Sequence, residues 1–120
     1  MTTLSFQLPR WLAGYERNLA ARRFATDTER MAAVIALAAE NVRRGSGGPF
    51  GAALFDHAGG RCVAAGVNVV LPARCSLLHA EIVALARAGK FFGVHDLSAA
   101  GRFALFTSVE PCTMCLGAVF

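Results

Sequence analysis

The sequence lacks any long apolar run, which argues against a membrane span. Its most apolar segment, "MAAVIALAA", is flanked by Glu29, Arg30 and Glu40, whereas a membrane-spanning helix needs about 18 consecutive apolar residues. Polar residues and Pro9 also interrupt the first ten positions, so no secretory signal peptide is predicted. We therefore expect a soluble, cytoplasmic protein with no membrane partner.

The sequence also lacks repeats, low-complexity tracts and a dense basic stripe. Lys and Arg number 12 against 8 Asp and Glu, for a net charge of +4, but only Arg22-Arg23 and Arg43-Arg44 are adjacent. Polynucleotide tracks gather their cations on one face, so this scatter favours an ordinary solvated surface, and nucleic acid is not the expected partner. The chain has 4 cysteine residues. In a reducing compartment these cysteines point to metal binding or catalysis rather than to a disulfide framework.

Apolar residues are abundant, at 55% of the chain against 17% charged, and this composition excludes disorder. A chain of 120 residues can bury one core but is small for a complete α/β enzyme. We expect a single domain over residues 1–120, with residues 1–25 as an N-terminal helical extension. Its helix, from Pro9 to about Ala21, is expected to pack through Trp11, Leu12, Tyr15 and Leu19.

A second helix is predicted to follow Thr26. Thr26 and Glu29 have the spacing of a capping box. Arg43-Arg44-Gly45 then supplies cations for a last turn and a glycine that can take a positive φ. The apolar residues at helical spacing that are expected to face the core are Met31, Val34, Ile35, Ala38 and Val42.

Three strands are expected in the remainder of the chain. "FGAALFD" and "RCVAAGVNVV" flank the turn "HAGG" and predict a hairpin, and "RFALFTS" predicts a third, buried strand. Ser76 is placed to cap a helix that runs to about Ala88, with Gly89 after its end, and Pro111 falls in the first turn of a final helix. The residues expected on the buried side of the helix after Ser76 are Ile82, Val83, Leu85 and Ala86.

This order of elements predicts an α/β fold with helices on the faces of the sheet. The helical crossover is expected to be right-handed, with its strand parallel to one member of the hairpin. Ligand sites in such sheets lie beyond the carboxyl ends of strands, near helix N-termini. Two short motifs of the sequence fall at such places.

The first motif is Cys112-x-x-Cys115, whose sulfurs lie one helical turn apart. A helix N-terminus favours the thiolate that binds zinc, but a redox pair or two buried core cysteines also fit this motif alone. The second motif, His79-Ala80-Glu81, is weak by itself, because a capped helix with a surface Glu explains it. One imidazole and two thiolates would leave a fourth tetrahedral position open, as in catalytic zinc sites.

Taken together, the two motifs resemble the cytidine-deaminase-like superfamily of zinc nucleobase deaminases. Within it, "GGPFGA", "GVN", "HAEIVAL", "HDLSA" and "SVEPCTMCLGA" are similar to the guanine deaminase branch. The resemblance covers residues 47–120 and implies a three-layer α/β/α fold with a mixed sheet. The C-terminal strands and helices of the family are expected to be absent from this chain, leaving an exposed sheet edge. For the full-length family the resemblance implies a homodimer.

The resemblance also implies the residues of a metal site. His79, Cys112 and Cys115 would hold one Zn²⁺ per chain with a bound water or hydroxide, whose pKa the metal lowers to about 7. Glu81 would be the catalytic residue, taking the proton of that water and delivering protons to a ring nitrogen and to the departing amine. Cys75 could instead complete a structural site with three cysteines, but this would leave Glu81 without a role.

Three further residues are implied to bind the base. Phe50 would pack on the purine ring, although it could equally fill the core below the glycine-rich loop. Asn68 would hydrogen-bond the base edge, although an Asn near a strand end is more often a turn residue. The backbone N–H of Ala80, free in a first helical turn, could donate to a ring carbonyl. Glu110 is expected to cap or order its loop rather than to catalyse.

The function implied by the resemblance is zinc-dependent hydrolytic deamination of a free purine base, with guanine giving xanthine and ammonia. One alternative is a tRNA adenosine-to-inosine deaminase, which shares the metal motif. An alternative of another class is a catalytically silent zinc-binding fragment. The remaining Cys and His residues are not expected to take part in a site. Cys62 is expected in the core, and His57 and His95 are expected at the surface.

Overall fold

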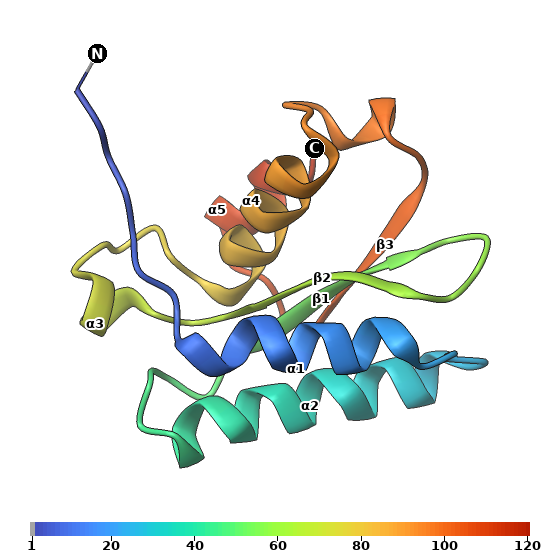
Figure 1. Ribbon diagram of the computed structural model, residues 1–120, viewed down its shortest axis with the longest axis horizontal. Coiled ribbons are helices and arrows are strands. Elements are labelled where there is room, and N and C mark those ends of the chain that lie inside the picture. The colour runs from blue at the N-terminus through green and yellow to red at the C-terminus, as the bar shows by residue number, and fades with distance from the viewer. Residues whose placement is uncertain (1) are drawn as a thin grey trace.

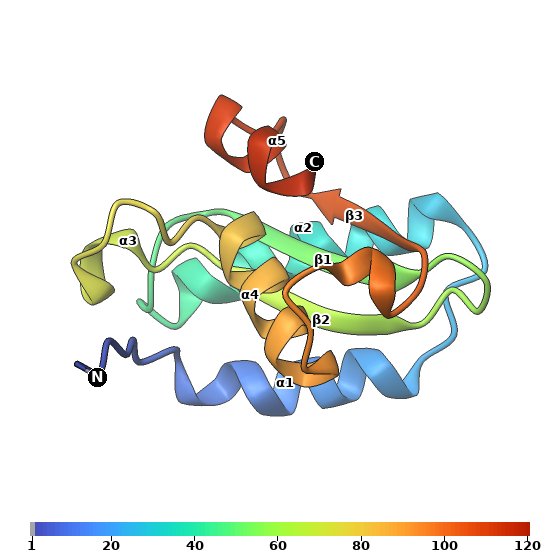
Figure 2. The same ribbon diagram turned by 90° about the horizontal axis from the view of Figure 1, so that it is seen from above.

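Helices lie on both faces of a three-stranded sheet, as the sequence predicts (Figure 1). The computed structural model describes residues 2–120, and in this part of the chain no helix is long and apolar enough to cross a membrane. Figures 1 and 2 show α1 and α2 on one face and α4 on the other. The elements are α1 (Arg10–Ala21), α2 (Asp27–Arg43), β1 (Gly51–Asp56), β2 (Cys62–Val67), α3 (Val70–Ala73), α4 (Ala80–Phe92), a 3₁₀ turn η1 (Leu97–Ala99), β3 (Phe103–Thr107) and α5 (Thr113–Val119).

The strand order is β2-β1-β3, and β1 pairs antiparallel with both neighbours. The predicted hairpin is confirmed, with Gly51 opposite Val67 at its open end. A bulge after Leu54 leaves Phe55 opposite Cys62. Strand β3 runs in the direction of β2, as expected for one member of the hairpin, but β1 lies between them. Both pairings of the described sheet are therefore antiparallel.

Helix α2 begins at the predicted capping box. The Thr26 hydroxyl accepts a hydrogen bond from the Glu29 N–H at 3.2 Å, and the Glu29 carboxylate accepts one from the Ala25 N–H at 2.9 Å. The predicted buried face is wrong at Ile35 and Val42, which are both about half exposed. The helix is rotated so that its core face consists of Ala33, Val34, Leu37, Ala38 and Asn41.

The helix predicted to run from Ser76 to about Ala88 corresponds to α4, and both of its predicted boundaries are wrong. Ser76 is exposed in a turn after α3, and α4 begins at Ala80 with His79 as its N-cap residue. At the other end the helix runs through Gly89 to Phe92, which packs on Phe103 with 5.3 Å between ring centroids. This contact outweighs the local stop signal at Gly89. The buried residues of α4 are Ala80, Glu81, Val83, Ala84 and Ala88, and the predicted Ala86 is exposed.

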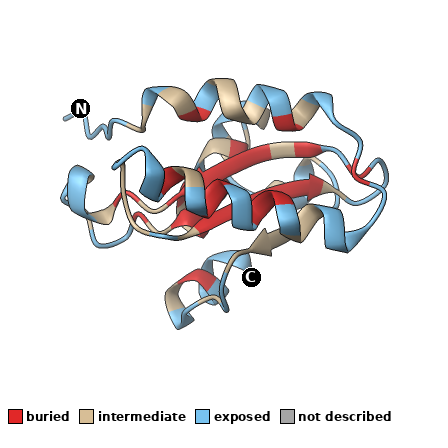
Figure 3. Cartoon of the chain, turned by 90° about the horizontal axis from the view of Figure 1, so that it is seen from below, coloured by how far each residue is buried: buried red, intermediate tan, exposed pale blue. Residues whose placement is uncertain are grey.

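Strand β3 is less buried than its apolar sequence predicts. All five of its residues are half-buried, because β3 pairs only with β1 within the described sheet (Figure 3). Pro111 lies just before α5 rather than in its first turn, because Cys112 is the N-cap residue. The exposed edge expected from the sequence is thus present at β3.

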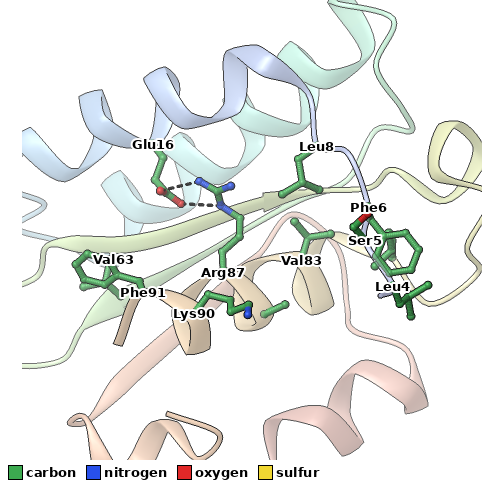
Figure 4. Close-up of a pocket in the computed structure, with 12 residues that line it drawn as sticks. Leu4, Ser5, Phe6, Leu8, Glu16, Val63, Val83, Arg87, Lys90 and Phe91 are labelled. Carbon is green, nitrogen blue, oxygen red and sulfur yellow. Dashed lines mark hydrogen bonds and ion pairs between the residues drawn. The ribbon is translucent and has the colours of Figure 1, made fainter. Parts of the chain in front are cut away.

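Helix α1 packs through the four residues predicted, with Leu12 and Leu19 buried and Trp11 and Tyr15 half-buried. It is also tied to the other face of the sheet by an ion pair. The Glu16 carboxylate accepts from the Arg87 guanidinium of α4 at 2.8 and 3.1 Å (Figure 4). The same carboxylate accepts from the Ala65 N–H at 2.8 Å, so Glu16 occupies a donor on the outer edge of β2. One side chain thereby connects all three layers.

Candidate active site

His79 and the two predicted cysteines meet at the N-terminal ends of α4 and α5. Their donor atoms all lie within 4.8 Å of one another. His79 Nδ1 is 3.6 Å from Cys112 Sγ and 3.7 Å from Cys115 Sγ. His79 and Cys112 are both N-cap residues, with extended backbone that aims each side chain beyond its helix end. The order of elements therefore brings together residues 33 and 36 positions apart in sequence.

These distances fit a tetrahedral zinc ion. Bonds of about 2.0–2.1 Å to nitrogen and 2.3 Å to sulfur, at tetrahedral angles, place nitrogen and sulfur about 3.6 Å apart. The observed separations of 3.6 and 3.7 Å match this value. One imidazole and two sulfurs are also the donor types that zinc prefers. In residues 2–120 the group contains no fourth His, Cys, Asp or Glu, and Cys75 packs against the core instead.

The two sulfurs have different environments. The Cys115 backbone N–H donates to the Cys112 sulfur and lowers the pKa of that exposed thiol. Burial, followed by the neighbouring Glu81 carboxylate, raises the pKa of Cys115 to about 12. A charge on the Cys115 sulfur thus needs a cation beside it, which a bound zinc ion would supply.

Glu81 is one of two buried polar or charged residues in the described core, at 5% exposed. It lies in the first turn of α4, one residue beyond Ala80 and two beyond His79. Carboxylates are seldom buried unless they are paired or functional. Together with His79 and Cys112, Glu81 lines a pocket of about 240 Å³.

The residues predicted to bind the base, Phe50, Asn68 and Ala80, line the same pocket. Phe50 and Asn68 lie side by side where the hairpin opens, since the Asn68 N–H donates to the Phe50 carbonyl at 3.2 Å. Phe50 also packs against Ala52, Ala80 and Ala84, so the pocket role and the core role are compatible.

Asn68 makes the turn contact at the strand end and also lines the pocket. Its side-chain oxygen accepts from the Val70 N–H at 3.2 Å, which forms the expected turn at the strand end. Within residues 2–120 its side-chain NH₂ makes no hydrogen bond, so this group is available to an acceptor in the pocket. The Ala80 N–H lies in the first turn of α4, where a helix provides no backbone acceptor.

Two residues were not assigned to the site from the sequence: Glu110, which lines the pocket, and Asn41, which is not among its lining residues. Glu110, predicted to order its loop, is exposed and lines the pocket together with Val109. The signal for Glu110 was its place two residues before the first cysteine ligand. Asn41 was missed entirely, although it is fully buried and bonds directly to the backbone of Asn68 at 2.9 Å.

A larger cavity lies elsewhere in the described chain. It has a volume of about 780 Å³ and is formed by the N-terminal segment, α1 and α4, with Leu4, Phe6 and Phe91 among its lining residues (Figure 4). The cavity is mainly apolar and has no His or Cys in its lining. His79 and Cys112 of the candidate metal-binding group line the smaller pocket instead.

Comparison with known proteins connects this arrangement to zinc-dependent deaminases. The profile of the cytidine and deoxycytidylate deaminase zinc-binding region matches residues 25–120. Guanine deaminase from Bacillus subtilis (strain 168) is 41% identical over 86 residues, which make up 72% of this chain and 52% of that protein. The chain spans about half the length of this relative.

Comparison with solved structures also shows similarity to deaminases. A structure of guanine deaminase from Nitrosomonas europaea has a TM-score of 0.88 and 43% identity, over 98% of this chain and 64% of that chain. A structure from a study of tRNA:A34 deaminases is more distant, with a TM-score of 0.66 and 29% identity over 77% of this chain and 66% of that chain. The similarity is thus greater to proteins that are named for a free base.

Proposed function

The chain belongs to the cytidine and deoxycytidylate deaminase zinc-binding family, and we propose that it deaminates a free purine base, guanine, to xanthine and ammonia. The observation that carries the proposal is the position of Glu81. This buried carboxylate lines the same pocket as His79 and Cys112, which also contains Phe50 and Asn68. The similarity to guanine deaminases supports guanine over other amino-substituted bases.

His79 Nδ1, Cys112 Sγ and Cys115 Sγ would hold one zinc ion per chain. When bound, zinc supplies a Lewis acid that makes water a nucleophile at neutral pH. The three side chains leave one tetrahedral position for a water or substrate oxygen, as in other catalytic zinc sites. Of the two sulfurs that would hold the ion, Cys115 is buried and Cys112 is exposed, and Cys112 lines the pocket together with Glu81.

Glu81 would carry the protons of the reaction on its carboxylate oxygens. Water adds to the carbon that bears the amino group, and a carbon–oxygen bond replaces the carbon–nitrogen bond. Glu81 would accept the proton released by the water and deliver it to a ring nitrogen. It would then take the proton of the hydroxyl newly bonded to the carbon and deliver it to the departing amine, so that a carbonyl forms and ammonia leaves. Such a positioned acid/base contributes a rate factor of about 10²–10⁴.

Three residues would hold the base against this carboxylate. The ring of Phe50 offers an apolar face, the Asn68 NH₂ offers donors, and the Ala80 N–H offers a third donor. Guanine presents acceptors along its edge that match these donors. Because the pocket has a volume of only about 240 Å³, a single base fits it better than a nucleotide.

The test is turnover of a panel of bases by the zinc-loaded chain, followed as ammonia release and product formation. Guanine is expected to be converted to xanthine, and adenine, cytosine and their nucleosides to be turned over at least tenfold more slowly. Binding of tRNA in 50 and 200 mM salt would be measured in parallel, because phosphate contacts give a steep salt dependence. Tight, salt-dependent tRNA binding with adenosine conversion and no guanine turnover would replace the proposal with tRNA editing.

A further inference from the structure

Besides Glu81, the described core contains one other buried polar residue, Asn41. Asn41 does not line the candidate active site. It lies on the core face of α2, where the other buried residues are apolar, and none of its surface is exposed. Burying an amide is costly unless its hydrogen bonds are satisfied. Every polar atom of this side chain is satisfied, and the partners of its NH₂ group belong to the segments that carry Phe50 and Asn68.

The Asn41 amide nitrogen donates two hydrogen bonds of 2.9 Å, one to the Gly48 carbonyl and one to the Asn68 carbonyl. The Gly48 carbonyl also accepts from the Phe50 N–H at 2.8 Å, and the Phe50 carbonyl accepts from the Asn68 N–H at 3.2 Å. These four bonds form a closed ring, which we call the Asn41 ring. It contains Asn41, Gly48, Phe50 and Asn68.

The glycine-rich loop is pressed against this ring. A Cβ atom on Gly47 would lie 1.9 Å from the Asn68 carbonyl oxygen and 2.8 Å from the Asn41 amide nitrogen. No side chain can be accommodated at this distance, so the loop and the strand end touch at backbone level. The amide of Asn41 sets their separation, and with it the separation of Phe50 from Asn68.

The amide oxygen of Asn41 links the ring to the N-terminal helix. It accepts from the Ser46 hydroxyl at 2.7 Å, and the Ser46 oxygen accepts from the indole N–H of Trp11 at 3.0 Å. Trp11 is the only tryptophan of the chain. Its fluorescence is therefore a reporter on the oxygen side of Asn41, independent of the two bonds made by the nitrogen.

We infer that Asn41 is a positioning residue for the purine base, which it never touches, because its amide fixes the relative placement of Phe50 and Asn68. The inference rests on the proposed function and identifies what determines base affinity in that pocket. Phe50 and Asn68 would contact the ring equally in the ground state and the transition state. Loss of their placement therefore raises KM and leaves kcat nearly unchanged.

The decisive variant is Asn41→Asp. It keeps the shape of the side chain and the acceptor for Ser46, but it replaces the donor to two carbonyls with an acceptor. The first control is Ser46→Ala, which removes the bond to Trp11 and leaves both nitrogen bonds intact. The second is Leu37→Ala, which opens a cavity in the same buried face of α2 and destabilises the protein without touching the ring.

The first measurement needs no substrate: amide hydrogen exchange at Phe50 and Asn68 in the full zinc-loaded chain. Asn41→Asp is expected to speed exchange at both amides at least tenfold more than Leu37→Ala does. Ser46→Ala is expected to shift the Trp11 emission while both amides stay protected. Equal exchange in Asn41→Asp and Leu37→Ala would overturn the inference, whatever the outcome with guanine.

The second measurement is steady-state guanine turnover. We expect Asn41→Asp to raise KM about tenfold with kcat within a factor of two, and both controls to keep KM within a factor of three. An unchanged KM in Asn41→Asp, or a KM raised equally by Leu37→Ala, would overturn the positioning role. A wild-type chain that holds zinc and turns over no guanine would refute the proposed function, and the exchange measurement would still decide whether Asn41 holds the ring.

Discussion

Gly66 of β2 lies directly against the backbone of Ala80 at the start of α4. A Cβ atom at Gly66 would be 2.2 Å from the Ala80 carbonyl oxygen and 2.5 Å from the Ala84 nitrogen. This close approach brings the N-terminal end of α4 down onto the sheet. The positions of His79 and Glu81 over the pocket therefore depend on a glycine that has no role in the chemistry.

Gly66→Ala is expected to displace the first turn of α4, because the added methyl group meets backbone rather than a movable side chain. We expect a loss of about 1–3 kcal/mol in unfolding free energy, as for an overpacked core, together with weaker zinc retention. Urea unfolding and metal analysis after dialysis measure the two effects. Gly14→Ala in α1 is the matched control, since its Cβ would meet only the Arg17 guanidinium at 3.6 Å. Equal stability of the two variants would contradict the role of Gly66.

The Glu16 carboxylate is expected to be worth more to stability than an exposed acidic residue. Glu16→Ala would leave the Ala65 N–H and the Arg87 guanidinium without their partner, at a cost of about 1–3 kcal/mol for the unsatisfied groups. Asp27→Ala is the control, because the Asp27 side chain is 81% exposed although it pairs with Arg30. Urea unfolding should show a clearly smaller loss for the control, and equal losses would show that Glu16 does not join the layers.

Cys62 should make stability fall at alkaline pH. Burial raises the pKa of Cys62 to about 12 in the folded chain, whereas an unfolded cysteine ionises near a pH of about 8.5. Between these values the folded state binds more protons than the unfolded state, so the free energy of unfolding decreases by up to about 1.4 kcal/mol per pH unit.

The prediction for Cys62 is tested with Cys62→Ala, which removes this proton but leaves the other titrating groups. The stability advantage of the wild type over the variant should shrink steadily between pH 8 and pH 11, measured by urea unfolding. An advantage that stays constant over this range would show that Cys62 does not titrate as its burial requires.

The sequence could predict that His79, Cys112 and Cys115 lie together, because local signals place each of them at or near the start of a helix. His79 and Cys112 precede helices, and Cys115 follows Cys112 by one turn, so the order of elements alone brings the three together. The hairpin and the capping box at Thr26 were also predicted from residues close together in the sequence, and both are confirmed.

The parts that could not be predicted depend on distant contacts. The start of α4 was misplaced because serine is a more common N-cap residue than histidine, so Ser76 was preferred to His79. The end of α4 was misplaced because the helix continues to Phe92, which packs against the distant Phe103. Asn41 looked like one polar residue in an amphipathic helix, yet its partner Asn68 is 27 positions away. The pair of Glu16 and Arg87 spans 71 positions and has no signature in the sequence.

The most direct test of the account compares wild type, Glu81→Gln and Cys112→Ser for zinc content and for ammonia release from guanine. Glu81→Gln is expected to retain zinc and to lose at least a factor of about 10² in turnover, because the amide cannot carry the proton. Cys112→Ser is expected to lose both zinc and turnover. Wild-type ammonia release that survives in Glu81→Gln, or zinc that stays fully bound in Cys112→Ser, would contradict the assignment of this pocket as a hydrolytic zinc site.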